Sequence, residues 1–117
     1  MSPTSSRGLP TIDISLGLWQ DRPPREVTTT ARLADKLGFG RVWVGEMATY
    51  DAFALATSVG TGFEYSELVV GPLAVTVRDP AMIAIGAASV ADLTGRHVSI
   101  ALGTSSTVVV EKWHGRS

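Results

Sequence analysis

The residues best suited to chemistry follow short β-type runs of the sequence. Glu46 is the one carboxylate at the end of such a run, which makes it the candidate for acid–base chemistry or for hydrogen bonding to a ligand. It could also cap the next helix or pair with Arg78. The turn Gly103-Thr104-Ser105-Ser106 offers backbone N–H groups to a phosphate or a ring carbonyl, although such turns also begin ordinary helices. It lacks the lysine and the glycine spacing of a nucleotide-binding loop.

Two tryptophans and a glycine–proline pair are further candidates. Trp19 ends the first run, where its ring could stack on a planar cofactor or fill the core, whereas Trp43 lies mid-run and is expected to pack between sheet and helices. Gly71-Pro72 interrupts the third run. Because proline cannot donate a hydrogen bond to a sheet, the pair predicts a bulge or an edge strand, with backbone that a ligand can approach closely.

Composition argues against several classes of function. We expect no metal site, because the chain has no cysteine and neither His97 nor His114 has a ligand partner at useful spacing. Ten Lys and Arg residues against eleven Asp and Glu residues give a net charge of −1, which argues against a nucleic-acid partner. No apolar run approaches the ~20 residues of a membrane span. We therefore expect a cytoplasmic protein, and 117 residues suffice for one domain.

The elements that must position these residues alternate along the chain. Four β-type runs cover residues 12–19, 41–47, 67–75 and 98–104, after a flexible segment over residues 1–11. Helical spacing predicts helices between Pro24 and Gly38, between Asp51 and Gly60 and between Asp79 and Gly95, with a fourth beginning at 107–113. This alternation predicts a parallel α/β sheet with right-handed crossovers, in which ligands gather at the carboxyl ends of the strands.

The third helical segment has the clearest start, because Asp79 is a good capping residue and Pro80 suits the first helical position. Small residues dominate this segment, which suits a helix pressed closely onto a sheet. The residues expected on its inward face are Met82, Ile85, Ser89 and Leu93, flanked by Ile83, Ala87 and Val90.

Five segments occur in an order that is familiar from one enzyme family: Leu16-Gly17-Leu18-Trp19, the stretch from Leu37 to Glu46 (LGFGRVWVGE), Val77-Arg78-Asp79-Pro80, Thr94-Gly95-Arg96 and Ala101-Leu102-Gly103-Thr104. Together they resemble the bacterial-luciferase-like oxidoreductases, which are (β/α)8 TIM barrels that bind FMN or the deazaflavin coenzyme F420. The ending TSSTVVVEKWHG is similar to an actinobacterial deazaflavin-dependent subgroup. The resemblance implies that residues 12–117 form the N-terminal half of such a barrel, a (βα)3β half-barrel plus the start of a fourth helix.

The resemblance also implies a function and a set of site residues. The reaction would be hydride transfer between the deazaflavin and a small organic substrate, with FMN-dependent monooxygenation as the alternative. The family's third strand carries a bulge with a cis peptide behind the cofactor ring, so we expect a cis bond between Gly71 and Pro72. The implied site comprises Glu46 as the catalytic residue and Trp19, Met47, Gly71, Pro72, Gly103, Thr104 and Ser105 as cofactor-binding residues, with Trp19 and Glu46 toward the substrate.

Departures from the family pattern concern the substrate and the length. Deazaflavin-dependent members that act on sugar phosphates have an Asp-His pair where this chain has Glu46-Met47, and a glutamate where it has Ser106. A complete barrel needs ~200–250 residues, and four parallel strands cannot close one. The chain is therefore expected to be a fragment, a truncated product or a half-barrel that pairs with another copy. A non-catalytic half-barrel, stable only as an oligomer, is the alternative from another class.

Overall fold

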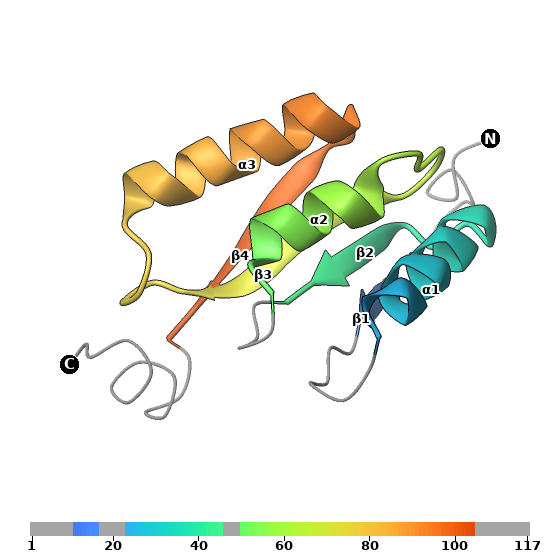
Figure 1. The fold of residues 1–117 in the computed structure, drawn as a ribbon, viewed down its shortest axis with the longest axis horizontal. Helices are drawn as coiled ribbons and strands as arrows, with labels where there is room; N and C mark the ends of the chain where they lie inside the picture. The colour runs from blue at the N-terminus through green and yellow to red at the C-terminus, as the bar shows by residue number, and fades with distance from the viewer. Residues whose placement is uncertain (1–10, 17–22, 46–49, 105–117) are drawn as a thin grey trace.

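The computed structural model describes residues 11–16, 23–45 and 50–104, which form one parallel sheet with three helices on the same face (Figure 1). The sheet order is β1-β2-β3-β4, so each strand pairs with its neighbour in the sequence. The strands are β1 (Ile14–Leu16), β2 (Arg41–Val44), β3 (Glu67–Ala74) and β4 (Val98–Gly103), and the helices are α1 (Pro24–Lys36), α2 (Ala52–Gly60) and α3 (Pro80–Thr94). The predicted (βα)3β order is confirmed. The expected flexible segment, apart from Thr11, and the expected fourth helix lie outside the described residues.

Helix ends follow from local residue chemistry. The Asp79 carboxylate accepts a hydrogen bond from the Met82 N–H (2.9 Å) and caps α3, while Gly95 ends the helix in the left-handed conformation with φ of 70°. The Asp51 carboxylate caps α2 in the same way, accepting from the Ala54 N–H at 2.9 Å. These caps satisfy backbone groups that a helix leaves unpaired at its ends.

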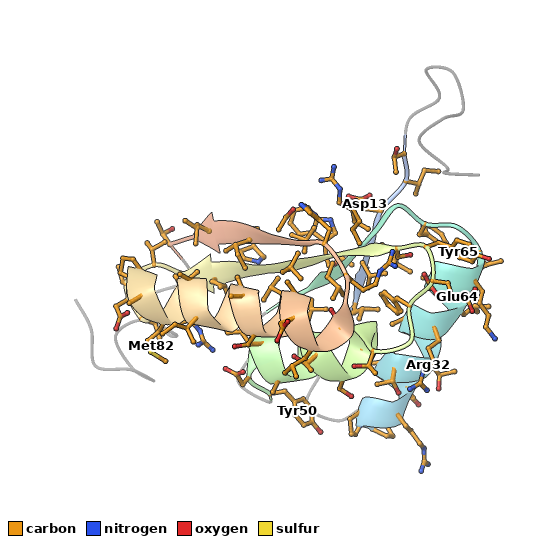
Figure 2. The ribbon with its side chains drawn as sticks, turned by 90° about the horizontal axis from the view of Figure 1, so that it is seen from above. Asp13, Arg32, Tyr50, Glu64, Tyr65 and Met82 are labelled. Carbon is orange, nitrogen blue, oxygen red and sulfur yellow. The ribbon has the colours of Figure 1, made fainter. Side chains whose placement is uncertain are left out.

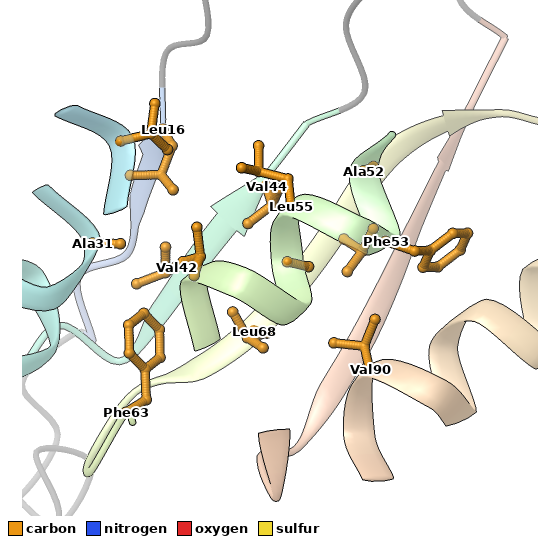
Figure 3. Packing of buried hydrophobic residues seen from close by; sticks show 14 of the residues in the cluster. Leu16, Ala31, Val42, Val44, Ala52, Phe53, Leu55, Phe63, Leu68 and Val90 are labelled. Atoms are coloured by element: carbon orange, nitrogen blue, oxygen red, sulfur yellow. The ribbon is translucent and has the colours of Figure 1, made fainter. Parts of the chain in front are cut away.

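The hydrophobic core lies between the sheet and the helices (Figure 3). Alternate residues of the central strands point into it, because successive strand side chains face opposite sides of a sheet. Small residues on α1 and α2 let these helices approach the sheet closely. Fully buried core residues include Val42, Val44, Leu68, Val70, Leu73, Ala31, Ala52, Ala56 and Val90.

The opposite face of the sheet is more polar. Trp43 was expected between sheet and helices, but that expectation is wrong, since its neighbours Val42 and Val44 take the core positions. Trp43 is half-buried on the other face, where its indole Nε1 donates a hydrogen bond to Asp13 (3.0 Å). Figure 2 shows Asp13 on the side of the sheet away from the helices.

The expected inward face of α3 is also wrong. Val90 is the buried residue of this helix, with Ile83 and Ala87 packed against the core. The residues Met82, Ile85 and Leu93 are 53%, 59% and 67% exposed. The helix carries apolar residues on several sides, so its periodicity could not identify the side that meets the sheet.

A buried carboxylate fastens α1 to the loop before β3. Asp35 accepts hydrogen bonds from the backbone N–H groups of Glu64, Tyr65 and Ser66, each at 2.8 Å. Burial by itself raises the pKa of Asp35, but the hydrogen bonds from these three N–H groups outweigh it and leave the pKa below its ordinary value. The carboxylate therefore stays ionised and joins segments about 30 residues apart.

Candidate functional site

The most distinctive backbone feature of the carboxyl-end region is a bulge in β3. Val70 pairs with Ile100 and Leu73 with Leu102, so three residue steps on β3 match two on β4. The extra residue falls at Gly71-Pro72, where a bulge was predicted, and the peptide bond between them is cis as expected. Pro72 is exposed, although its neighbour Leu73 is fully buried. The bulge therefore turns the Pro72 ring out of an otherwise buried strand, while Gly71 stays buried.

Three glycines bring backbone close together around this bulge. A Cβ atom at Gly71, whose φ is 137°, would lie 2.2 Å from the Ala101 carbonyl oxygen, so only glycine fits there. A Cβ at Gly103 would lie 3.2 Å from the Pro72 Cβ, and one at Gly45 would lie 3.8 Å from the Gly71 carbonyl oxygen. Glycine backbone thus follows β2 at Gly45, forms the buried part of the β3 bulge at Gly71 and ends β4 at Gly103, on neighbouring strands.

The loop that leaves β3 is fixed by backbone hydrogen bonds. The Val75 N–H donates to the Gly103 carbonyl (3.0 Å), which joins the ends of β3 and β4. The N–H groups of Val77 and Arg78 both donate to the Ala74 carbonyl, at 3.0 and 3.3 Å. These bonds hold the start of the loop beside the end of β4.

An ion pair connects this loop to the start of α2. The Arg78 guanidinium donates to the Asp51 carboxylate and lies over the Phe53 ring, 4.9 Å from its centroid. Burial by itself raises the pKa of Asp51, but hydrogen bonds from the Ala54 N–H and from Arg78, with the positive charge of Arg78, leave it below its ordinary value. From the sequence, Glu46 was a possible partner of Arg78, and Asp51 was not predicted as one. The pair ties together the loops that follow β2 and β3.

The predicted site residues divide into two groups. Gly71, Pro72 and Gly103 are brought together, and Thr104 follows Gly103 as an exposed residue at the same end of the sheet. The other predicted site residues lie outside the described residues; they are Trp19, Glu46, Met47 and Ser105.

His97 lies at the opposite, amino-terminal edge of the sheet, where its Nδ1 is 3.4 Å from the Glu67 carboxylate. Within residues 11–16, 23–45 and 50–104, no group of three or more His, Asp or Glu side chains is arranged to hold a metal ion. None of the helices in this described part has the length and apolarity of a bilayer-spanning helix.

Known proteins share this architecture over most of the chain. A protein provisionally named a coenzyme F420-dependent oxidoreductase, from Mycobacterium tuberculosis (strain ATCC 25618 / H37Rv), is 27% identical over 105 residues. The match covers 90% of this chain but 30% of that protein, so the chain spans under a third of its relative's length.

Solved structures give the same picture of the fold. The coenzyme F420-dependent tetrahydromethanopterin reductase from Methanopyrus kandleri superposes with a TM-score of 0.76 at 19% identity, over 90% of this chain and 30% of the reductase. The oxygenating constituent of 3,6-diketocamphane monooxygenase from Pseudomonas putida, solved with FMN, gives 0.74 at 13% identity, over 90% and 32%. These likenesses confirm the predicted fold class, four parallel strands of a (β/α)8 barrel.

The family model described as luciferase-like monooxygenase matches residues 7–117, which is nearly the whole chain. The matched range includes all four strands of the parallel sheet described above. The chain therefore belongs to the luciferase-like monooxygenase family.

Proposed function

We propose that this chain forms the ring-binding half of a deazaflavin-dependent oxidoreductase, which transfers a hydride between coenzyme F420 and a small organic substrate. The observation that carries the proposal is the bulge at Gly71-Pro72, flanked by Gly45 and Gly103. Family membership and the relative named as F420-dependent support it.

The glycines around the bulge suit a planar ring. A flat cofactor needs a wall with few projecting side chains, and Gly45 after β2, Gly103 at the end of β4 and the exposed Pro72 ring of β3 would form one. Gly71 and Pro72 would back the ring, while Gly103, Thr104 and Ser105 would contact its edge. Met47 would complete the cofactor contacts. When bound, the deazaflavin ring supplies the two-electron chemistry.

The remaining roles belong to the chain's own side chains. Glu46 would hold or move a proton on the substrate side, and Trp19 would present an aromatic wall there. The pair of Arg78 and Asp51 would keep the adjoining loops in place, since it links the segments after β2 and β3. No nucleic acid enters this proposal, and the cysteine-free composition suits a cytoplasmic enzyme.

FMN is the second candidate cofactor. One structural neighbour is an oxygenating monooxygenase constituent in complex with FMN. In this version the same backbone wall would bind reduced FMN, and the reaction would be monooxygenation with molecular oxygen.

Four strands leave a barrel open, so the proposed site needs four more. They would come either from further sequence on the same polypeptide or from a second copy, the two completions that the chain's length suggests. A half-barrel with no activity, stable only as an oligomer, is the alternative that binding measurements separate from these.

A titration with a matched pair of variants tests the proposal. We expect the full chain to bind coenzyme F420 more tightly than FMN, as followed by cofactor absorbance and fluorescence. Thr104→Glu places a negative charge at the expected ring edge and should weaken binding about tenfold or more. Thr30→Glu, at another exposed threonine, on α1, should leave binding unchanged. Absence of binding to either cofactor would favour the half-barrel with no activity, and equal effects of the two variants would count against the site.

A further inference from the structure

The side chains on one face of the sheet change in size and charge along the strands. This face lies away from the helices, so it becomes the inner wall of a (β/α)8 barrel, whose helices form the outer ring. We call it the inner face; its residues alternate with Val42, Val44 and Leu68, which point into the core. A row of charged or titratable residues crosses it at the amino-terminal ends of the strands: Asp13, Arg41, Glu67 and His97.

Toward the carboxyl ends of the strands, small residues replace this charged row. The interior of a (β/α)8 barrel is normally filled by bulky branched side chains. Among the described residues of the inner face beyond the charged row, only Trp43 is larger than valine. This half of the wall therefore leaves room for a ligand. The residues concerned are Ser15, Trp43, Val69 and Ser99 in one row of the register, and Gly45, Pro72, Ala101 and Gly103 beyond it.

Trp43 lies at the lower limit of this small-sided wall. Its indole Nε1 donates a hydrogen bond to the Asp13 carboxylate (3.0 Å), which holds the ring toward the charged row. Val69, the partner of Trp43 in the register, is only 2% exposed, whereas Pro72, further along β3, is exposed. The inner face is therefore closed at the level of Trp43 and open toward the carboxyl ends of the strands.

We propose that Trp43 is a specificity-determining residue, whose indole forms the floor of the substrate space and limits how deeply a substrate enters the barrel. The level of Gly45 lies two residues further along the chain, which is ~6.7 Å for an extended strand. That depth suits a group no larger than a single ring between Trp43 and the glycines of the proposed cofactor site. The inference rests on the proposed function, because the cofactor defines this space as a substrate site.

The chemistry of the inner face favours an uncharged substrate group. Its charged residues, as far as the structure describes them, lie below Trp43 in the amino-terminal row. The Asp13 carboxylate beside the indole would repel an anion at the floor. Trp43 and Val69 offer apolar surface to a ligand. The hydroxyl groups of Ser15 and Ser99 can donate or accept a hydrogen bond. A small, partly apolar group with one hydrogen-bonding atom therefore fits best.

Two compounds that share a ring and differ in charge test the floor. The full chain has three tryptophans, and Trp43→Phe identifies the indole N–H signal of Trp43 in the NMR spectrum of ¹⁵N-labelled protein. With coenzyme F420 bound, cyclohexanol should shift this signal with a dissociation constant on the order of 1–10 mM. Cyclohexanecarboxylate should bind at least about tenfold more weakly, because it brings a negative charge toward Asp13.

Two serine variants locate the binding. Ser99→Leu fills the wall in the same row as Trp43 and should weaken cyclohexanol binding about tenfold or more. Ser89→Leu, at an exposed serine on α3, should leave binding unchanged. Circular dichroism checks that both variants fold. If Ser99→Leu does not fold, Trp43→Ala is the second test: it removes the floor, so the two-ring alcohol decahydro-2-naphthol should bind this variant, and not the parent, in saturation-transfer NMR.

The outcomes separate this inference from the proposed function. If coenzyme F420 binds but cyclohexanol does not shift the Trp43 signal, the floor is overturned and the proposed function stands. Equal binding of the two ring compounds, equal effects of the two leucine variants, or no binding of decahydro-2-naphthol to Trp43→Ala would likewise overturn the floor. A shift of the Trp43 signal in a chain that binds no cofactor would support the floor and overturn the proposed function. Absence of both would overturn both.

Discussion

Helices α1 and α3 lie on the same face of one sheet, yet they meet the solvent with opposite chemistry. Helix α1 buries Val27, Ala31 and Ala34 and shows charged residues on its outer side. Helix α3 buries Val90 and shows Met82, Ile85 and Leu93 instead. Both helices meet the sheet through small and β-branched residues, so contact with the sheet does not explain the difference. The outer residues of a helix therefore indicate its surroundings independently of the residues that meet the sheet.

The first test places a charge on the buried side and on the exposed side of α3. Val90→Asp would bury an unpaired carboxylate and should lower the free energy of unfolding by about 3–5 kcal/mol. Leu93→Asp, on a side chain that is 67% exposed, should change it by less than about 0.5 kcal/mol in the single chain. Urea unfolding followed by circular dichroism measures both. Similar losses for the two variants would mean that the sides of α3 are wrongly assigned.

The second test concerns the buried carboxylate that α1 has and α3 lacks. Asp35→Ala would leave three backbone N–H groups without their acceptor and should cost about 2–4 kcal/mol. Because folding lowers the pKa of Asp35, its ionised form stabilises the fold above the ordinary value of 3.8, and this contribution is lost as the pH falls through the lower, folded-state pKa. In Asp35→Asn, the free energy of unfolding should therefore fall less steeply as the pH is lowered. If the free energy of unfolding of Asp35→Asn falls at acid pH as it does in the parent, Asp35 does not cause that loss.

A third test probes how closely α3 approaches α2. A Cβ atom at Gly86 would lie 2.6 Å from the Phe53 ring, so Gly86→Ala forces the ring or the helix to shift. We expect a loss of about 1–2 kcal/mol, even though alanine favours helix more than glycine does. Ser89→Ala, on the exposed side of α3, serves as the control and should be neutral or slightly stabilising. A higher melting temperature for Gly86→Ala would show that a methyl group fits between α3 and the Phe53 ring.

The smallest expected effect distinguishes the starts of the two helices. Helix α3 has a side-chain cap in Asp79, whereas Pro23 at the start of α1 supplies none. Asp79→Ala should therefore lower stability by about 1 kcal/mol, measured by thermal unfolding. Replacing Pro23 with alanine removes no capping bond and should have a smaller effect. An equal loss at both positions would indicate that the caps do not account for the difference.

Local chemistry made much of the fold predictable from the sequence. Asp79 followed by Pro80, and glycine at position 95, identify the ends of α3 because few other arrangements suit those residues. Gly71-Pro72 identified the bulge because proline cannot complete a sheet ladder. Within the candidate site, the sequence predicted the bulge and its cis bond, while the roles of the site residues stay a prediction.

The errors and omissions share a different physical origin. Apolar residues recur at helical spacing on more than one side of α3. The sequence therefore predicted Met82 and Ile85 on the inward side, whereas both are exposed. The strand alternation places Trp43 on the face opposite to Val42 and Val44, but it does not indicate which of the two faces the helices cover. Asp35 resembles a surface residue of a polar helix until the loop 29–31 residues away closes over it. Long-range contacts of this kind leave no local pattern to find.

The simple sheet order, with each strand beside its predecessor, also bears on how the protein is made. Every new strand pairs with an edge that is already complete, so a chain leaving the ribosome never waits for a later segment before an earlier one can form. Each strand pairing joins residues 26–30 positions apart, so the loop that must close is never longer than one βαβ unit. The order of synthesis and the order of packing therefore coincide in this molecule.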